Sequence, residues 1–490
     1  MASTADPSIA QATQQFQELV AYVTGPATTH STAYEVERTP FRQVVALGLL
    51  LLRLFLVTRA APRPPAPPAE PDGPRWVAHG RRSTTCVSVC GKLTFERHAF
   101  RAPGRSVICP LDACLSVPAR CSSDLLRAWA AYGSTDAAYR ETQALLGRIL
   151  GQTRSVQALE TGVATDAVDV VAFFERPAEP VPPAALGSVV VAQADGKGVP
   201  IVLPPRAARP ARRGKGHPPD TNREAIVTAL CTIAPYPRTP EEVAAALLRE
   251  ASAPPRPARP RPIAKELRAT LDGKDAARGR LARRAAQREH AAIEHRVALT
   301  DGAEALQRRM LTALPAFTPV LDIIHAVEYL WAVATTLLGE RHPDRTAWMR
   351  RQLEQMLSGQ TAALIAALEA VAADPARTTG RRQVVQKAIG YYRRTAPVMR
   401  YDEHLSRGWP IGTGVVEGAC GHLVKDRMEQ AGMRWTKPGA HAVLDLRSVR
   451  LTTVWDASRQ FHRQQQHHRL YGPASAVPAG PDTHLLELAA

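Results

Sequence analysis

Apolar and polar positions divide the N-terminal third of the chain into helices and one hairpin. Residues 36 to 59 are mostly apolar and predict a helix, and residues 119 to 175 carry apolar side chains at helical spacing. Between them, residues 82 to 101 alternate as the strands of a β-hairpin do. A glycine-containing turn within the 119 to 175 segment is typical of a helix-turn-helix DNA-binding region, and equally of a small helical bundle.

From Gly187 onward the pattern changes to strands that alternate with helices. The segment SVVVAQADGKGVPIVL predicts a strand, a glycine turn after Asp195 and a second strand, and a third strand begins at Glu224. A fourth strand ends at Asp301, and a short fifth strand near Phe317 leads into a long apolar helix. Three hairpin-like strands followed by alternating helix and strand predict an α/β domain of the RNase H-like type.

Three carboxylates lie at corresponding places in this pattern. Asp195 is on the first strand, Asp301 ends the fourth, and Glu417 begins a helix after the fifth. Adjacent central strands would bring the two aspartates together, and the helix would place the glutamate beside them. Clustered hard oxygen ligands suit Mg²⁺ or Mn²⁺, and two ions about 4 Å apart can promote phosphodiester chemistry. Taken singly, each aspartate also fits an Asp-Gly turn, and the glutamate an ordinary exposed side chain.

The stretch from Trp409 to Trp435 places Glu417 after a glycine turn and at the start of a helix. Gly412 and Gly414 are expected to permit a backbone that side chains would obstruct. The apolar face of the helix is expected to hold Leu423, Val424 and Met428, and its exposed face Lys425, Arg427 and Glu429. Cations near the glutamate are candidate DNA contacts, namely Lys425, Arg427, Arg434 and Lys437. Trp435 is either a core side chain or a platform for a DNA base.

The charge of the chain points to nucleic acid. Its 490 residues carry a formal net charge of +17 and a pI of about 10.0, which is typical of proteins that meet nucleic acid or an anionic membrane. Arg212, Arg213 and Lys215 stand in a cation-rich segment without acids, and they are further candidate DNA contacts. We therefore expect double-stranded DNA as the partner.

Cysteine usage and hydropathy favour a cytoplasmic protein. Seven cysteines, an odd number, do not predict a disulfide framework in a chain of this length. Four of them stand at spacings that a zinc site allows, although small apolar side chains are the simpler interpretation: Cys86, Cys90, Cys109 and Cys114. The apolar run from Val44 to Val57 is too short to span a bilayer and contains Arg53. We therefore expect a buried or oligomerising helix and no membrane contact.

Several segments together resemble the ISKra4-type insertion-sequence transposases, a group of bacterial DDE transposases. The resembling segments cover roughly residues 80 to 472: ADGKGVP at Ala194, YPRTPEEV at Tyr236, ALTDGAEALQ at Ala298, LDIIHAVEYLW at Leu321, GWPIGTGVVEGACGHLVKDRMEQAGMRW at Gly408 and WDASRQFHRQQQHHRLYGP at Trp455. The segment at Gly408 is the most specific. The resemblance implies an RNase H-like catalytic domain that cleaves transposon-end DNA and joins it to target DNA.

Carried over by position, the resemblance implies specific roles for five residues. Asp195, Asp301 and Glu417 would be the catalytic triad and would bind Mg²⁺ or Mn²⁺, as two ions. Asp322 and His325 would form an auxiliary Asp-x-x-His pair, although Asp322 also competes for the role of second acid. The resemblance further implies inverted-repeat and target DNA as partners, and a homo-oligomer associated with the bacterial nucleoid.

The chain departs from the family pattern at Gly421, where a cation is expected. Two alternatives stay open, namely a catalytically inactive, transposase-derived DNA-binding protein and an RNase H-like nuclease that does not join strands. The expected parts of the chain are an N-terminal helical region (1–60), a Pro-rich linker (61–80), a hairpin and helical DNA-binding region (81–180), the first part of the catalytic domain (181–334), a helical insertion (335–400), the last part of the catalytic domain (401–472) and a frayed tail (473–490).

Overall fold

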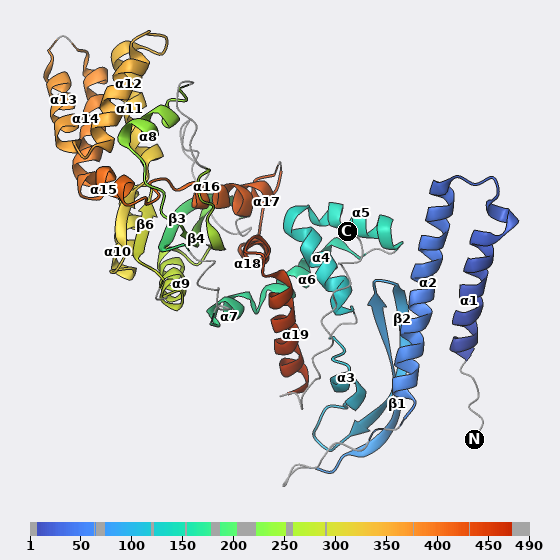
Figure 1. Ribbon diagram of the computed structural model, residues 1–490. Helices are drawn as coiled ribbons and strands as arrows, with labels where there is room; N and C mark the ends of the chain where they lie inside the picture. The colour runs from blue at the N-terminus through green and yellow to red at the C-terminus, as the bar shows by residue number, and fades with distance from the viewer. Residues whose placement is uncertain are drawn as a thin grey trace. The chain divides into compact units, whose positions relative to one another are not determined.

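Figure 1 shows the computed structural model, which describes residues 7–62, 64, 74–118, 122–151, 154–177, 187–202, 222–250, 258–289, 292–375, 377–430 and 432–472. The chain forms two compact units. The first, called the terminal unit below, combines Met1–Asp169 with Asp456–Ala490. The second, the sheet unit, is Val170–Trp455.

The terminal unit contains a helical pair, a β-hairpin and a group of shorter helices. Its elements are α1 (Pro7–Thr24), η1 (Pro26–Thr28), α2 (Ala33–Ala60), β1 (Val77–Ser88), β2 (Gly91–Arg101), α3 (Pro110–Cys114), α4 (Asp124–Asp136), α5 (Tyr139–Leu150), α6 (Val156–Ala167) and, apart from its first residue, α19 (Trp455–Tyr471). The helix and hairpin predictions for this region are confirmed, although β1 begins within the segment expected to be linker.

Local sequence signals determine where the short helices of the terminal unit begin and end. Ser123 and Ser155 each accept a hydrogen bond from a backbone amide in the first turn of the helix that follows, α4 and α6. Gly151 ends α5 with a φ of 69°, a conformation that favours glycine. The three helices α4, α5 and α6 pack around an apolar centre of Ala130, Leu146 and Leu159. This packing suits both the bundle and the helix-turn-helix interpretation.

Helix α19 belongs to the terminal unit, although residues 401–472 were expected to complete the catalytic domain. His462 Nδ1 lies 2.7 Å from the Asp169 carboxylate, and Arg469 donates two hydrogen bonds, of 2.6 and 2.8 Å, to the same carboxylate. Arg127 on α4 donates to the buried Asp166. Buried carboxylates need such partners, so these contacts explain why α19 packs here. The sequence showed charged residues in α19 but not the aspartates they pair with.

Helix α2 is longer than the apolar run from which its length was judged. It has 28 residues and begins with a capping box formed by Thr32 and Glu35. By length and composition, α2 is the one helix in the described part of the chain that could cross a membrane. The argument that the run is too short to span is therefore wrong, whereas Arg53 does lie within the helix.

The sheet unit has a mixed α/β fold, as expected (Figure 1). Its elements are α7 (Val170–Glu175), β3 (Val189–Pro200), β4 (Asn222–Ile233), α8 (Pro240–Leu247), β5 (Ile263–Thr270), α9 (Lys274–Gln287), β6 (His295–Thr300), α10 (Glu304–Ala313), β7 (Thr318–Leu321), α11 (Ile323–Leu338), α12 (Arg345–Leu357), α13 (Thr361–Ala373), α14 (Thr379–Thr395), η3 (Ala396–Val398), α15 (Tyr401–Ser406), α16 (Gly414–Ala419), the π-helical turn η4 (Cys420–Lys425), α17 (Asp426–Met428) and α18 (Lys437–Leu451). The helices α12 to α14 lie in the segment expected to be a helical insertion.

The five strands form one sheet in the order β5-β4-β3-β6-β7. Strand β4 pairs antiparallel with both β3 and β5, whereas β6 runs parallel to β3 and to β7. The expected turn after Asp195 is wrong, because β3 continues through Asp195 and Gly196 as one strand paired with β4. The segment expected to be a third strand, from Glu224, is therefore the second, and β5 is a strand that the sequence analysis missed.

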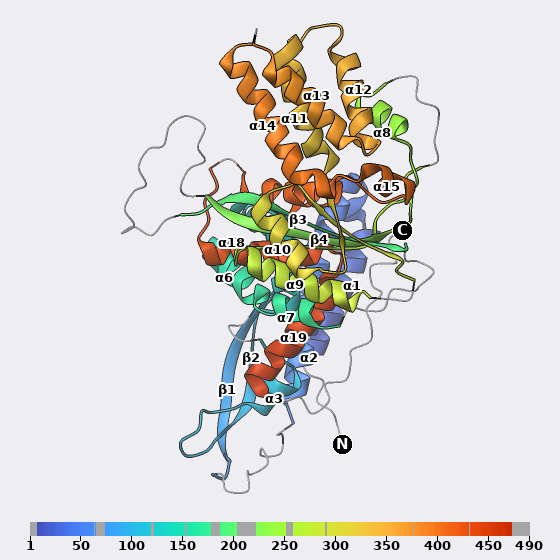
Figure 2. The ribbon, with the colours of Figure 1, turned by 90° about the vertical axis from the view of Figure 1, so that its left-hand side faces the viewer.

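The two faces of the sheet are covered by different helices. Even-numbered residues of β3, such as Val190 and Ala192, pack with apolar residues of α9 and α10, and Figure 2 shows both helices beside the sheet. Odd-numbered residues, such as Val189 and Val191, share a core with α8, α11 and the helical bundle. Because side chains alternate along a strand, Asp195 belongs to the second face.

The β5 edge of the sheet is covered by α18 and by the residue that follows it. Backbone amides of β5 donate to two hydroxyl groups there, Ala269 to Ser448 at 3.2 Å and Leu267 to Thr452 at 3.0 Å. Covering an edge strand in this way satisfies amides that would otherwise be open to pairing with another chain. It also anchors α18, and with it the segment that carries the candidate site.

Candidate catalytic site

The parallel pairing of β3 and β6 places two of the predicted acids side by side. Their register runs from Val189 opposite His295 to Gln193 opposite Leu299. Continued by two residues, to the residue just after β6, this register would put Asp195 opposite Asp301. Asp195 lies in the middle of β3, Asp301 directly follows the carboxyl end of β6, and both acids are half-buried.

The Asp195 carboxylate has two hydrogen-bond donors near it. Its Oδ1 accepts from the amide of Gly196 at 2.6 Å, and its Oδ2 accepts from the Cys420 thiol at 3.3 Å. The sequence analysis missed Cys420, although it stands three residues after Glu417 and therefore on the same helical face. Burial, and after it the charge of Asp195, raises the pKa of the Cys420 thiol, so the thiol stays protonated and donates.

Glu417 lies on α16, which is tied to the centre of the sheet. The side chain of Gln193 on β3 accepts a hydrogen bond of 2.9 Å from the amide of Val416. One turn later the helix widens into η4, and the buried Arg447 donates to the carbonyl groups of His422 and Leu423. Single π-helical turns occur frequently at functional sites, because they redirect side chains within a helix.

The charges of both aspartates act on the Glu417 carboxyl group. Partial burial of its carboxyl group, followed by the negative charge of Asp195, raises the pKa of Glu417 above its ordinary value. Asp322 and Asp301 raise it further, and only His325 lowers it. A carboxyl group surrounded by other carboxylates binds a proton or a cation more readily than an isolated one.

Asp322 and His325 form the pair that the resemblance implied. His325 Nδ1 lies 2.7 Å from Asp322 Oδ2, and Asp322 Oδ1 accepts a hydrogen bond of 2.9 Å from the amide of Thr413. The hydrogen bond to Asp322 is the main cause that raises the pKa of His325, to about 9, so the imidazole is a cation at neutral pH. Burial alone would raise the pKa of Asp322, but the bonds from His325 and Thr413 lower it below its usual value.

The helical bundle contacts the loop that carries Asp301. The Tyr391 hydroxyl on α14 donates to the Asp301 carbonyl at 3.4 Å, and Arg394 donates to the Gly302 carbonyl at 3.4 Å. The Tyr391 ring stacks on Tyr329 of α11, with 4.0 Å between ring centroids. Gly302 has a φ of 84° and lies against Tyr391, so a side chain would not fit there. Helices expected to be an insertion therefore support the second acid.

The three acids have the right chemistry for a hard divalent cation, but their carboxylates lie too far apart to bind one together. Asp195, Asp301 and Glu417 offer carboxylate oxygens, the ligands that Mg²⁺ and Mn²⁺ prefer. Across the described ranges, no group of three or more His, Cys, Asp or Glu side chains is close enough to hold a metal ion. Asp195, Asp301 and Glu417 are therefore not close enough together in this structure to hold one ion between them. The same finding applies to the cysteine set considered for zinc, namely Cys86, Cys90, Cys109 and Cys114.

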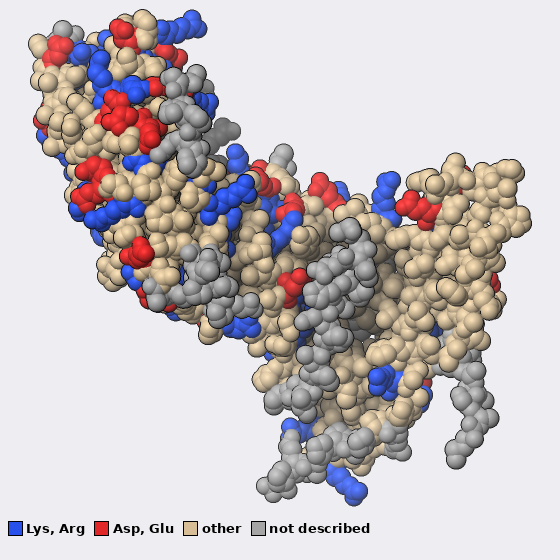
Figure 3. All heavy atoms as spheres, in the orientation of Figure 1, with Lys and Arg blue, Asp and Glu red and all other residues tan. Residues whose placement is uncertain are grey.

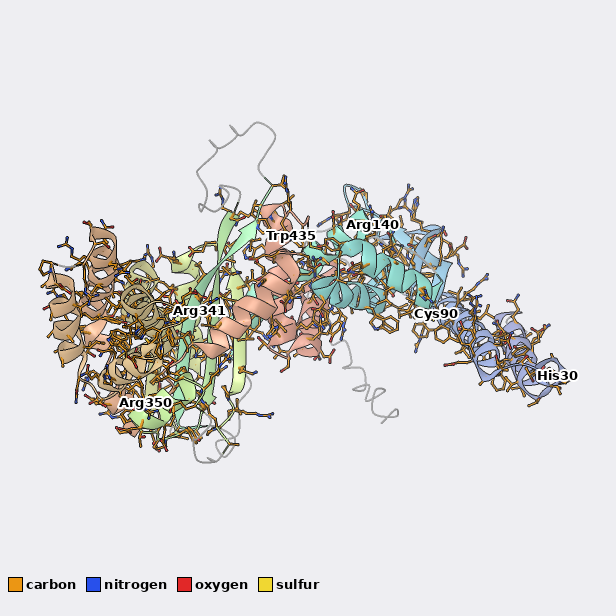
Figure 4. All side chains as sticks on the ribbon, turned by 90° about the horizontal axis from the view of Figure 1, so that it is seen from above. His30, Cys90, Arg140, Arg341, Arg350 and Trp435 are labelled. Atoms are coloured by element: carbon orange, nitrogen blue, oxygen red, sulfur yellow. The ribbon has the colours of Figure 1, made fainter. Side chains whose placement is uncertain are left out.

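Two of the candidate DNA contacts are buried, which corrects the sequence analysis. Arg427 is fully buried, and its guanidinium carbon lies 4.7 Å from the centre of the Trp435 ring. Trp435 is 6% exposed and donates from Nε1 to the Met428 carbonyl at 3.2 Å (Figure 4). Its backbone also pairs with the end of β3, through Pro200 and Val202. Both side chains hold this segment against the sheet, and the stacking role for Trp435 does not fit.

The remaining candidate contacts are exposed or lie outside the described residues. Lys425, Arg434 and Lys437 are exposed and belong to the segment between Glu417 and α18. The three cations of the basic segment lie outside the described residues: Arg212, Arg213 and Lys215. The structure therefore keeps three of the four cations near Glu417 available to a ligand.

The glycines of the motif have other roles than expected. A Cβ at Gly412 would make only an ordinary contact with Asp322, and one at Gly414 would meet open space, so neither glycine is required by crowding. The glycine that is required is Gly408, whose φ is 73° and where a Cβ would lie 2.4 Å from the Tyr236 amide nitrogen. That close contact joins two of the segments on which the resemblance rests. A Cβ at Gly421 would also meet open space.

No protein-family model matches the chain, and no curated protein matches it. The function proposed below rests on the residues and contacts of this site.

Proposed function

We propose that the protein is a DDE transposase that cleaves the ends of an insertion sequence and joins them to target DNA. The observation that supports this proposal is the parallel register of β3 and β6, whose continuation by two residues would put Asp195 opposite Asp301. Glu417, on a helix bonded to the same strand, is electrostatically coupled to both. Three acids from three separate elements would in this way supply the carboxylates of a DDE triad.

The strand order supports an RNase H-like domain as the framework. Three antiparallel strands, β3, β4 and β5, are followed by two parallel strands added beside the first, β6 and β7. This is the arrangement in which the first and fourth strands become neighbours and bring their acids together. Helix α16, which bears the third acid, packs on β3 and β4.

Within this proposal, Asp195, Asp301 and Glu417 would hold Mg²⁺ or Mn²⁺, as two ions. Such ions polarise a phosphodiester and neutralise the charge that develops on its oxygens. Cys420 orients Asp195, and Tyr391 holds the backbone of Asp301. Asp322 is 1% exposed, and its carboxylate accepts bonds from His325 and Thr413, so it serves to orient His325 rather than to bind an ion.

The proposed substrate is double-stranded DNA. The net charge of +17 favours a polyanion, and Lys425, Arg434 and Lys437 are exposed close to Glu417 along the chain. Figure 3 shows Lys and Arg side chains spread over the surface of the sheet unit, interspersed with acids. DNA held by these cations would lie against the acid cluster, since η4 and α17 follow α16 directly.

The decisive experiment compares the second acid with its rival in the full-length chain. Mn²⁺ binding, measured by electron paramagnetic resonance, and Mn²⁺-dependent cleavage of a plasmid carrying the DNA that flanks the gene are followed for Asp301→Asn and Asp322→Asn. We expect Asp301→Asn to lose both activities and Asp322→Asn to retain Mn²⁺ binding. The opposite pattern would show that Asp322 is the second acid.

Two further outcomes of the same assay separate the alternatives. DNA binding without cleavage or Mn²⁺ binding in the wild type would indicate a catalytically inactive, transposase-derived DNA-binding protein. Cleavage without joining of the cut end to a second DNA would indicate an RNase H-like nuclease. We expect cleavage and joining in the wild type.

A further inference from the structure

The helical pair α1 and α2 exposes an unusually large apolar surface. Nine large apolar side chains on these helices are exposed by 45 to 70% of their area: Ile9, Phe16, Val20, Val23, Tyr34, Phe41, Val44, Leu51 and Phe55. The two helices contact each other, and the Gln15 side chain donates to the Gln43 carbonyl at 3.2 Å. Figure 3 shows the region of α1 and α2 almost free of charged side chains. Exposed patches of this kind mark interaction sites.

The nine exposed positions follow a heptad repeat. In α2 they fall at intervals of seven, three, seven and four residues, which are the a and d positions of a coiled coil. In α1 they fall at intervals of seven, four and three residues, again at a and d. No exposed large apolar side chain of either helix lies outside this pattern. A seam at a and d is the surface that another helix packs against.

The β-hairpin covers only a small part of this seam. Gly48 occupies an a position of α2, and a Cβ there would lie 2.9 Å from Cys90 Sγ at the hairpin turn (Figure 4). The glycine thus lets the turn approach the helix at one point. Phe41 and Val44 on one side of that point, and Leu51 and Phe55 on the other, are exposed.

The exposed area is sufficient for a stable interface between two chains. If half of each large side chain is exposed, nine of them leave on the order of 800 Å² of apolar surface. A standard protein–protein interface buries about 800 Å² on each partner. A second copy of the same seam would therefore supply a complete interface of ordinary size.

A lipid bilayer is a poorer match for this surface than a second helix. A bilayer does not distinguish a heptad seam from the rest of the helix, whereas the remaining faces of α2 carry Arg38, Arg42, Arg53 and Arg59. Arg53 stands within the apolar run itself, where a membrane-spanning helix rarely carries charge. Within the apolar run, the most exposed large side chains are those of the seam, namely Val44, Leu51 and Phe55.

We propose that α1 and α2 of one chain pack along this seam against α1 and α2 of a second copy, forming a homodimer through a helical bundle. The partner is another copy of this chain, because two copies of the seam have the same length and are apolar along both helices. This interface is independent of the proposed catalytic function, and it would exist in an inactive protein as well.

The test measures the mass of the full-length protein by sedimentation equilibrium at micromolar concentration. We expect the wild type to have twice the chain mass of 53.1 kDa. The double variant Phe41→Glu with Phe55→Glu should sediment at one chain mass, because it places charge in the seam. The matched control Leu145→Glu with Ile149→Glu, at two similarly exposed positions of α5, should retain the dimer. Unchanged circular dichroism confirms that the variants fold.

A complementary pair of variants guards against an indirect effect. Val44→Glu and Val44→Lys should each sediment as monomers, and an equimolar mixture should regain the dimer mass, because Val44 lies near the middle of the seam. A monomeric wild type, or a dimer that survives the Phe41 and Phe55 changes, would overturn the proposal. So would flotation of a monomeric wild type with vesicles of phosphatidylcholine and phosphatidylglycerol, which would show that the seam meets lipid.

Discussion

Asp301 and Asp322 each follow a parallel strand and stand just before a helix, yet the structure treats them differently. Asp301 is half-exposed, and its Oδ1 accepts one bond, of 2.8 Å, from the amide of Ala303. Asp322 is 1% exposed, and its two oxygens accept three bonds, from Thr413 and from two groups of His325. An acid whose oxygens are already occupied holds the fold, whereas one left partly open is available to a ligand. Packing, rather than position along the chain, separates the two.

The largest expected effect concerns catalysis. Asp301→Asn should lower the rate of DNA cleavage by more than about 10³-fold, with the free energy of unfolding changed by less than about 1 kcal/mol. Asp195→Asn and Glu417→Gln should behave in the same way, and all three should still bind DNA. Cleavage rates and denaturant unfolding of the same preparations check this. Full activity in Asp301→Asn would contradict the difference between the two acids.

Replacing Asp322 should mainly lower the stability of the fold, whereas replacing Asp301 should mainly lower the rate of cleavage. Asp322→Ala leaves the Thr413 amide buried without its acceptor and His325 without its counter-ion, so we expect a loss of about 2–4 kcal/mol in the free energy of unfolding. Urea unfolding followed by circular dichroism measures it, with Asp301→Ala as the matched control. Equal losses in the two variants would mean that the buried contacts of Asp322 contribute no more to the free energy of unfolding than those of Asp301.

The Asp322–His325 pair should also make stability depend on pH. Because the pKa of His325 is raised from 6.5 to about 9, its contribution is fully present below about pH 6.5 and is lost as the pH rises through about 9. The pKa of Asp322 is lowered, so its contribution is lost only at acidic pH. The melting temperature between pH 6.5 and 9.5 should therefore fall more steeply in the wild type than in His325→Gln. Parallel curves would contradict the pairing.

Tyr391 tests whether the helical bundle positions Asp301. Tyr391→Phe removes the hydrogen bond to the Asp301 carbonyl, so we expect cleavage to slow about 3- to 10-fold and the apparent affinity for Mn²⁺ to fall. Tyr329→Phe, which changes the ring stacked on Tyr391, is the matched control and should leave both quantities unchanged. A loss of stability without a change in Mn²⁺ affinity would assign Tyr391 a structural role only.

The smallest expected effect is on the salt dependence of DNA affinity in Gly421→Arg, which tests whether DNA binds near Glu417. A side chain fits there, so Gly421→Arg should fold and add about one phosphate contact, which steepens the slope of log affinity against log salt concentration by about 0.9. Gly380→Arg, at another open glycine, should leave the slope unchanged. A slope near zero for the wild type would contradict backbone-dominated DNA binding altogether.

The acids could be predicted from the sequence because their signals are local. An apolar run precedes Asp195 and another precedes Asp301, and the parallel pairing of β3 with β6 brings these two runs side by side. Strand β5 could not be predicted in this way, because its sequence is charged. Its buried Glu266 pairs with Arg284 of α9 at 2.5 Å, a partner that only the fold supplies.

Arg427 shows the same limit at the site itself. By helical spacing it belongs with exposed charges, but the chain turns after α17 and brings Trp435 over its guanidinium group. Arg427 and Trp435 are close in sequence, but a turn separates them. Helical periodicity does not predict the path of that turn, so it could not predict their contact. Cys420 and Tyr391 were missed for a related reason, since each acts on an acid of another element.

The pairing of His462 with Asp169 has a consequence for how the protein is made. The two residues are 293 positions apart, and the whole sheet unit is synthesised between them. At about 5–20 residues per second, the aspartate precedes its partner by roughly 15–60 s. During that interval Asp169 lacks His462 and Arg469, whereas Asp166 can already pair with Arg127, and the sheet unit can begin to fold. The ribosome thus sets an order in which the sheet unit is synthesised before α19 can join the first part of the terminal unit.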